Sequence, residues 1–185
     1  VSEAAYAAFR DFVLTHRAVV DPLIATRVTN TNEVRRSTFL RAGYAAIAAE
    51  TGRALGIVEL GPSAGLNLNW DRYAYAYRLP DGGVLRGGPA SALELDCAVR
   101  GAAPPVPDAP PDVASRVGLE LNPVDLGSAA DRRWLVALLW PSQPDRMARL
   151  TAALEIAAQH KPPVIAGDAL KNIGPQLALI PAEVT

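Results

Sequence analysis

The sequence contains few of the residues that form metal sites and disulfides. Among its 185 residues are one cysteine, Cys97, and two histidines, His16 and His160. A single cysteine excludes an intramolecular disulfide, and these three side chains do not have the spacing of a structural metal site. We therefore expect the protein to hold no metal.

Long apolar runs and runs of one charge are also absent. No stretch approaches the roughly 18 apolar residues that a membrane span needs, and the first residues lack the basic-then-apolar order of a signal peptide. The net charge is -1 without a basic run, which argues against a nucleic-acid-binding track. We expect a cytoplasmic protein without membrane or nucleic-acid partners. Its first residue is Val1 rather than Met, so we expect the sequence to be part of a longer chain.

The residues that are present are typical of a globular protein. Hydrophobic residues make up 50% of the chain and charged residues 20%, which is an ordinary balance for a packed domain. Residues 1–52 are rich in alanine, with apolar residues at helical spacing, and predict an N-terminal segment of two or three helices. Within this segment, Asn30 and Glu33 match a capping box that would start a helix running through Ala49.

From residue 53 the pattern changes to one of strands. A short apolar run over Leu55–Leu60, bounded by glycines, predicts a buried parallel strand, and a helix is expected from about Ala64. Strict alternation over residues 73–77 predicts another strand, and Asp81-Gly82-Gly83 predicts a hairpin turn. These features indicate a β-ribbon inserted at about residues 73–100.

The rest of the chain alternates between helix and strand patterns. Residues 101–112 are rich in proline and predict an extended connector. The expected elements after it are a strand at 114–121, helices at 130–139 and 143–159, and a strand at 164–166. Strands that alternate with helices form parallel sheets covered on both faces. We therefore expect an α/β fold, with residues 53–185 forming a partial Rossmann-like domain.

The stretch GPSAG, from Gly61 to Gly65, has three interpretations. At the carboxyl end of a parallel strand, such a turn presents backbone N–H groups to a ligand. The same residues match the G-x-S-x-G elbow of α/β-hydrolases, with Ser63 as nucleophile. That interpretation lacks an oxyanion loop, because the residues before Leu55 are predicted to be helical. In the third interpretation the glycines only turn a strand into a helix.

Acidic residues follow the two neighbouring strands. Glu120 ends the next strand and is a candidate to accept hydrogen bonds from the ribose hydroxyls of a nucleoside, with Leu121 against the base. Asp168 and Ala169 follow the third strand, where the carboxylate is a candidate partner for the exocyclic amine of adenine. The alternative for Glu120 is an ordinary polar strand exit. Asp168 is also a candidate helix N-cap, and its two roles do not exclude each other. Together the three strand ends favour a nucleoside site.

Five motifs resemble an uncharacterised bacterial family known only as a domain of unknown function. They are, in order, TNEVRRS, VELGPSAGLNLNWDRY, GLELNPVDL, DRRWLVALLWPSQPDRMARL and GDAL. The resemblance implies a fold similar to that of the class I S-adenosylmethionine-dependent methyltransferases. The spacing of Glu59, Gly61 and Gly65 also resembles the first motif of those enzymes. The implied function is binding of S-adenosylmethionine and transfer of its methyl group to an unknown acceptor.

The resemblance also implies roles for individual side chains. The implied cofactor-binding residues are Glu59, Gly61, Ser63, Ala64, Gly65, Asn67, Glu120, Leu121, Asp168 and Ala169. The implied substrate-facing residues are Asn32, Glu33, Arg36, Trp70, Asp71 and Arg72. For this second group, helix capping and solvated charge are the alternative. No catalytic residue is assigned, because displacement at a sulfonium methyl group depends on orientation more than on proton transfer.

Members of the family that this chain resembles run beyond both of its ends. A complete methyltransferase sheet has more strands than the three expected here, and residues 177–181 lead toward a fourth. We expect a parallel strand edge to be exposed as a result, which favours a homodimer formed through that edge. A catalytically inactive fragment, or a methyltransferase-like binding or scaffold module, is the alternative to an active enzyme.

Overall fold

The computed structural model describes residues 2–185 and contains two three-stranded sheets. The larger sheet has the order β1-β5-β6, with β1 spanning Leu55–Leu60, β5 Val113–Glu120 and β6 Val164–Ala166. Both strand pairs are parallel. The mixed α/β fold and its parallel sheet are therefore confirmed, and β1 and β6 have the predicted bounds.

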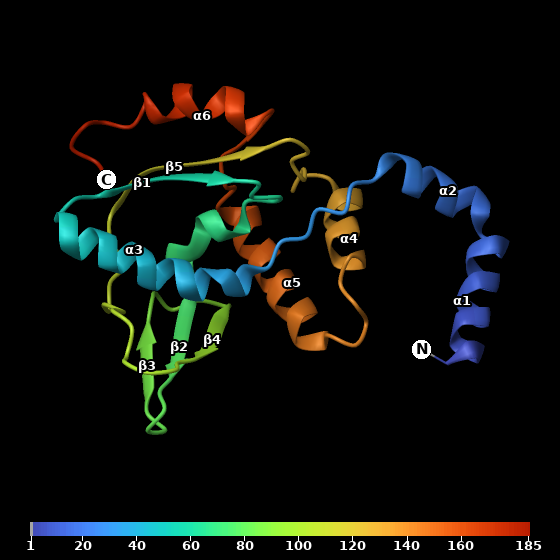
Figure 1. Cartoon of the computed structure of the whole chain (residues 1–185), viewed down its shortest axis with the longest axis horizontal. Coiled ribbons are helices and arrows are strands. Elements are labelled where there is room, and N and C mark those ends of the chain that lie inside the picture. The colour runs from blue at the N-terminus through green and yellow to red at the C-terminus, as the bar shows by residue number, and fades with distance from the viewer. Residues whose placement is uncertain (1) are drawn as a thin grey trace.

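Helices lie on both faces of this sheet (Figure 1). One face is covered by α3 (Ser37–Thr51), the short 3-10 helix η2 (Leu66–Arg72) and α5 (Pro144–Gln159), and α4 (Ala129–Ala137) packs beside α5. The other face is covered by α6 (Ala169–Leu177). The apolar side chains of Leu55 and Ile57 point toward the first face and pack with Leu68 and Trp70. Burial of these side chains holds η2 against the sheet.

The path of the chain reverses at β1. From β1 it proceeds outward to β5 and then to β6, and α6 carries it back across the opposite face. There Thr185 donates its N–H to the carbonyl of Ala54 (2.9 Å) and accepts the N–H of Gly56 (2.6 Å). Because the N–H of Leu55 points to β5, the N–H of Gly56 points to the opposite edge of β1. The outer edge of β1 is therefore met by Thr185 at its first residues.

The predicted ribbon is part of the second sheet, which has the order β3-β2-β4. Strand β2 (Ala74–Arg78) pairs antiparallel with β3 (Val84–Gly87), as the hairpin turn predicted. Strand β4 (Glu94–Ala98) pairs parallel with β2 and adds a third strand that the sequence pattern did not indicate. Its pairing depends on a contact between segments far apart in sequence, which alternation alone does not report.

Three buried tyrosines attach the second sheet to the rest of the molecule. The hydroxyl of Tyr73 donates to the carbonyl of Leu66 (2.6 Å), that of Tyr75 to Trp70 (2.5 Å), and that of Tyr77 to Thr38 (2.8 Å). Their rings belong to the main apolar core. Each buried hydroxyl thus has a partner, and the sheet is fixed to η2 and α3.

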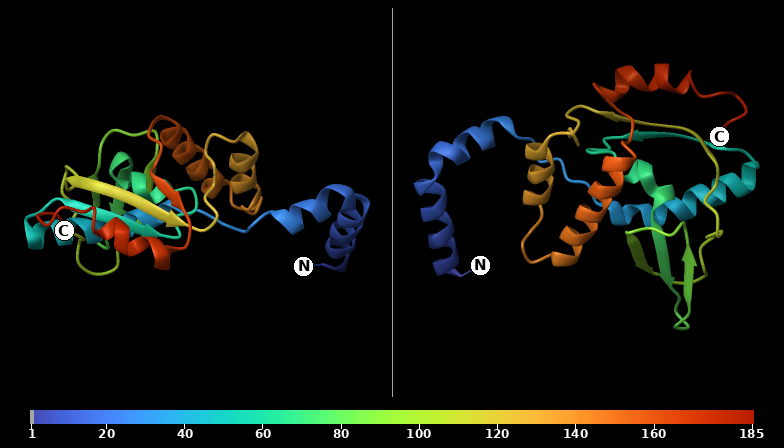
Figure 2. Two further views of the ribbon diagram at one scale, coloured as in Figure 1. Left: turned by 90° about the horizontal axis from the view of Figure 1, so that it is seen from above. Right: turned by 180° about the vertical axis from the view of Figure 1, so that it is seen from behind.

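The N-terminal helices α1 (Glu3–Thr15) and α2 (Arg17–Thr26) extend away from this body, as Figure 2 shows from above. Neither helix has a buried residue. The predicted capping box is wrong. The amide of Asn30 donates to the carbonyl of Asn122 (3.2 Å), while Glu33 caps a 3-10 turn, η1 (Val34–Arg36), through the N–H of Arg35. The helix α3 begins only at Ser37, directly after η1.

The helix expected from about Ala64 is present, but it is a 3-10 helix and starts slightly later in the chain. Gly61 (φ 65°), Ser63 (φ 57°) and Gly65 (φ 73°) all have left-handed backbone conformations. Such residues prevent a right-handed helix from starting within the turn. The helix η2 therefore begins only at Leu66, after the last of them.

Replacement of Gly65 tests how tightly this turn is packed. In Gly65→Ala, the added Cβ would lie 2.7 Å from Cγ2 of Val164. The alanine would also have to adopt the left-handed backbone conformation of residue 65 (φ 73°), which is unfavourable for residues with a Cβ. We expect the free energy of unfolding in urea to fall by about 2 kcal/mol or more. The control Gly43→Ala places a methyl group in open space on α3 and should stabilise by up to about 1 kcal/mol. Equal urea midpoints of unfolding for Gly65→Ala and the wild type would contradict this packing.

Candidate functional site

The carboxyl ends of the three parallel strands meet at one edge of the sheet. The N–H of Gly61 donates to the carbonyl of Leu119 (2.9 Å), and the N–H of Gly167 donates to the carbonyl of Glu120 (2.9 Å). The structure thus places the Gly61 turn, Glu120 and the residues after β6 next to one another. This edge lies where the chain reverses at β1, which is the position at which open α/β sheets bind ligands.

The carboxylate of Glu120 holds the Gly61 turn in its conformation. Its Oε2 accepts the N–H of Ser63 (2.8 Å), and its Oε1 accepts the N–H of Asn122 (3.1 Å). The residue is only 8% exposed. Since each carboxylate oxygen has two lone pairs, both oxygens retain the capacity to accept one further hydrogen bond.

The segment before η1 supports the turn from the other side. The amide of Asn32 donates to the carbonyl of Pro62 (2.8 Å) and accepts the N–H of Leu66 (3.2 Å). Asn32 is 7% exposed, so its side chain binds the backbone of the turn rather than opening toward solvent. We identify Asn32 as a positioning residue for the turn, a role that the sequence did not indicate.

Ser63 is not arranged as a nucleophile in this structure. Its side chain is buried, and its hydroxyl donates to the carbonyl of Asn30 (3.1 Å). Within residues 2–185, no histidine side chain forms a hydrogen bond with it. The Ser–His contact that activates the serine of a hydrolase elbow is therefore missing from this arrangement.

A polar cluster lies below the turn at the end of β1. Burial raises the pKa of Glu59, and a hydrogen bond from Asn67 and the positive charge of Arg36 partly oppose this rise. The carbonyl oxygen of Asn67 accepts the hydroxyl of Ser37 (3.0 Å). This bond orients the Asn67 amide so that its NH2 group is directed at Glu59.

The other predicted side chains have different surroundings. Trp70 is fully buried in the core beneath β1. Asp71 forms a two-pronged ion pair with Arg116 (2.7 Å for each bond), and Arg72 is exposed at the end of η2. These three residues form the end of η2 that is farther from the turn. The structure therefore does not bring them to the strand ends.

Three residues of the predicted nucleoside site differ in how far they are exposed and in the contacts they make. Leu121 is 68% exposed and lies directly after Glu120. Asp168 is the N-cap of α6, because its Oδ1 accepts the N–H of Leu170 (2.9 Å). Ala169, the first residue of α6, is half-buried. The N-cap role of Asp168 is thus confirmed, and the cap uses one of its two carboxylate oxygens.

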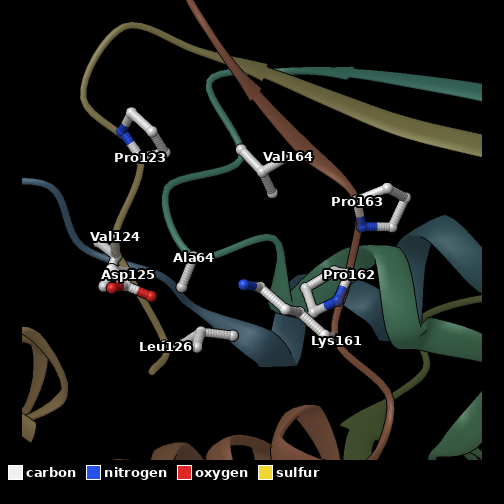
Figure 3. Close-up of a pocket in the computed structure, with 9 residues that line it drawn as sticks. All are labelled: Ala64, Pro123, Val124, Asp125, Leu126, Lys161, Pro162, Pro163 and Val164. Atoms are coloured by element: carbon white, nitrogen blue, oxygen red, sulfur yellow. The ribbon is translucent and has the colours of Figure 1, made fainter. Parts of the chain in front are cut away.

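A cavity of about 350 Å³ adjoins the turn at Ala64 (Figure 3). Its walls are mainly apolar and come from the loop after β5 and from the segment that enters β6. The Lys161 ammonium group and the Asp125 carboxylate enter it from opposite sides. Sequence reasoning missed Lys161, since a single lysine before Pro162 has no signature of its own. The cavity places one cation and one anion beside the Gly61 turn.

A family described as "Uncharacterized protein conserved in bacteria (DUF2332)" matches residues 2–185. The chain belongs to this family. The resemblance inferred from the five motifs is thereby confirmed at the level of the family. No curated protein and no solved structure matches the chain significantly. In the part of this DUF2332 chain that the structure describes, no helix has both the length and the apolar character needed to cross a membrane.

The raised pKa of Glu59 predicts a pH dependence of stability. Its carboxylate is disfavoured in the folded protein, so the unfolding free energy should fall as the pH rises from the ordinary glutamate pKa, about 4.3, through the raised value. Glu59→Gln removes this loss and should be more stable than the wild type at neutral pH. Urea denaturation at several pH values measures how the unfolding free energy of the wild type and of Glu59→Gln changes with pH. Glu155→Gln, on the exposed side of α5, should keep the wild-type slope, and an unchanged slope in Glu59→Gln would refute the assignment.

The surroundings of Ser63 predict no reaction with serine-hydrolase reagents. We expect a fluorophosphonate probe to leave Ser63 unmodified in the folded protein, because the hydroxyl is buried and has no general base. Intact-mass spectrometry, with Ser63→Ala as a control, measures the labelling. Stoichiometric labelling that disappears in Ser63→Ala would restore the hydrolase interpretation.

Proposed function

We propose that the protein binds S-adenosylmethionine at the Gly61 turn and is a methyltransferase. The observation that carries this proposal is the position of the turn at the reversal of the chain, where β1 is flanked by β5 on one edge and by Thr185 on the other. In open α/β sheets the crevice at such a point is the usual ligand site. The family match is compatible with this proposal but assigns no activity.

The residues present fit this cofactor in three respects. Gly61 is exposed, and a Cβ added there would meet no atom within 4 Å, so a ligand has room to approach the backbone. The free lone pairs of Glu120 suit the ribose hydroxyls. The exposed side chain of Leu121 offers an apolar surface for adenine. The cavity beside Ala64 provides further space next to the turn.

The bound cofactor would supply an electrophilic methyl group on a positively charged sulfur. The chain's own residues hold and orient the ligand, and the Glu120 carboxylate lies against the turn. Such a displacement requires alignment and exclusion of water rather than a protein base. The two candidate bases, Asp71 and Glu33, form ion pairs with Arg116 and Arg146, respectively.

A non-catalytic binding module is the second candidate function. The observation in its favour is that both oxygens of Glu120 already accept backbone N–H groups of the protein. A residue that mainly stabilises the turn would be retained without any cofactor. The two candidates differ in whether S-adenosylmethionine binds and whether its methyl group is transferred.

Calorimetric titration with S-adenosylmethionine and S-adenosylhomocysteine tests the proposal. We expect saturable binding by the folded protein, and about tenfold weaker binding by Glu120→Gln because a charged acceptor is lost. Glu155→Gln should bind as the wild type does. Thermal unfolding of each variant separates lost binding from lost folding.

The absence of binding by the folded wild type, or unchanged binding by a folded Glu120→Gln, would overturn the cofactor assignment. Methyl transfer is followed separately with cofactor carrying a labelled methyl group and a mixture of small-molecule acceptors. Binding without any transferred label would favour the non-catalytic module.

A further inference from the structure

We propose that a second site, between η1 and the start of α5, binds a small phosphate ester. A cavity of about 440 Å³ lies there, which is within the range of small-molecule sites, roughly 300–1,000 Å³. Three arginines line it, Arg35, Arg146 and Arg149. We call it the arginine cavity. This inference does not depend on the proposed methyltransferase function.

The three arginines differ in how far the protein neutralises them. The Nε of Arg35 donates to the carbonyl of Asp96 (2.9 Å), whose carboxylate lies 3.6 Å from the Arg35 guanidinium. Arg146 forms an ion pair with Glu33 (2.6 Å). Each of these cations therefore has an acidic partner.

Arg149 has no such partner. Its guanidinium forms no hydrogen bond or ion pair within residues 2–185. The side chain as a whole is half-buried, and its Nε atom is fully buried. A buried charged donor without an acceptor is rare in folded proteins, because the group loses its hydration and gains nothing in return. A bound anion in the arginine cavity would supply the missing acceptor.

The position of Arg149 allows it to act together with Arg146. The two residues are three positions apart on α5, so they lie on the same face of the helix. Three arginines and two acids, Glu33 and Asp145, line the cavity, and a third acid, Asp96, pairs with Arg35 from outside the lining. With Arg35 and Arg146 both paired, Arg149 is the lining arginine without an ion-pair partner among residues 2–185. Of the two acids, Asp145 is exposed and forms no ion pair with residues 2–185. Its charge opposes an anion in the cavity.

The chemistry of the lining favours phosphate among anions. Guanidinium groups donate parallel hydrogen bonds that match the oxygens of phosphate, and they keep their charge at any physiological pH. Ser142 and Gln143 add neutral polar groups at the same cavity. The cavity is much larger than a single phosphate ion, so its remaining volume indicates that the phosphate is attached to a small organic group.

The test is calorimetric titration of the full chain with inorganic phosphate and with phenyl phosphate, at constant ionic strength set by sodium chloride. We expect saturable binding of both, with tighter binding of the ester. Arg149→Gln should weaken phosphate binding about tenfold or more. Asp145→Asn should tighten it about twofold to fivefold, because a repulsive charge is removed. Arg100→Gln, an exposed arginine outside the cavity, should have no effect.

Three results would overturn the proposal. The first is the absence of saturable phosphate binding by the wild type. The second is unchanged binding by an Arg149→Gln variant whose thermal unfolding matches the wild type. The third is acetate binding as tight as that of phosphate, which would show that the cavity does not select phosphate. If Arg149→Gln fails to fold, weaker or unchanged binding by Asp145→Asn counts equally against the proposal.

Discussion

The left-handed turn at Gly61, Ser63 and Gly65 is the constraint on which the rest of this structure depends. It redirects the chain from the end of β1 to the face beneath the sheet, where η2 carries Trp70 into the core. The second sheet is attached to η2 and α3 through tyrosine hydroxyls. A different conformation at the turn would therefore move the core and the second sheet together.

Two buried side chains from distant parts of the sequence hold this turn. Asn32 binds it from before η1, and Glu120 binds it from the end of β5. Because the bonds of both are buried, loss of one partner leaves an unsatisfied polar group, which costs about 1–3 kcal/mol. The same bonds keep the backbone of the turn fixed before any ligand arrives. Such preorganisation reduces the entropy that binding would otherwise cost.

The elements predicted well were those with a purely local signal. The bounds of β1 and β6 follow from short apolar runs between glycines and prolines, and the N-cap at Asp168 follows from local hydrogen bonding. The errors have tertiary causes. The side chain of Asn30 binds the carbonyl of Asn122 instead of capping a helix, and β4 is defined only by its pairing with β2. In the candidate site, the strand ends were predicted together, but the cavity around Lys161 was not.

The sequence by itself determined the parallel α/β class, the meeting of three strand ends at one edge, and the family. These properties follow from hydrophobic periodicity and from motif spacing, which are local along the chain. Only the tertiary structure decided what the polar residues do there. It showed Ser63 bound to a carbonyl, Asp71 paired with Arg116, and the Nε atom of Arg149 buried without a partner among residues 2–185. The physical reason is that the partner of a buried polar group is set by packing between distant segments, which composition and spacing do not contain.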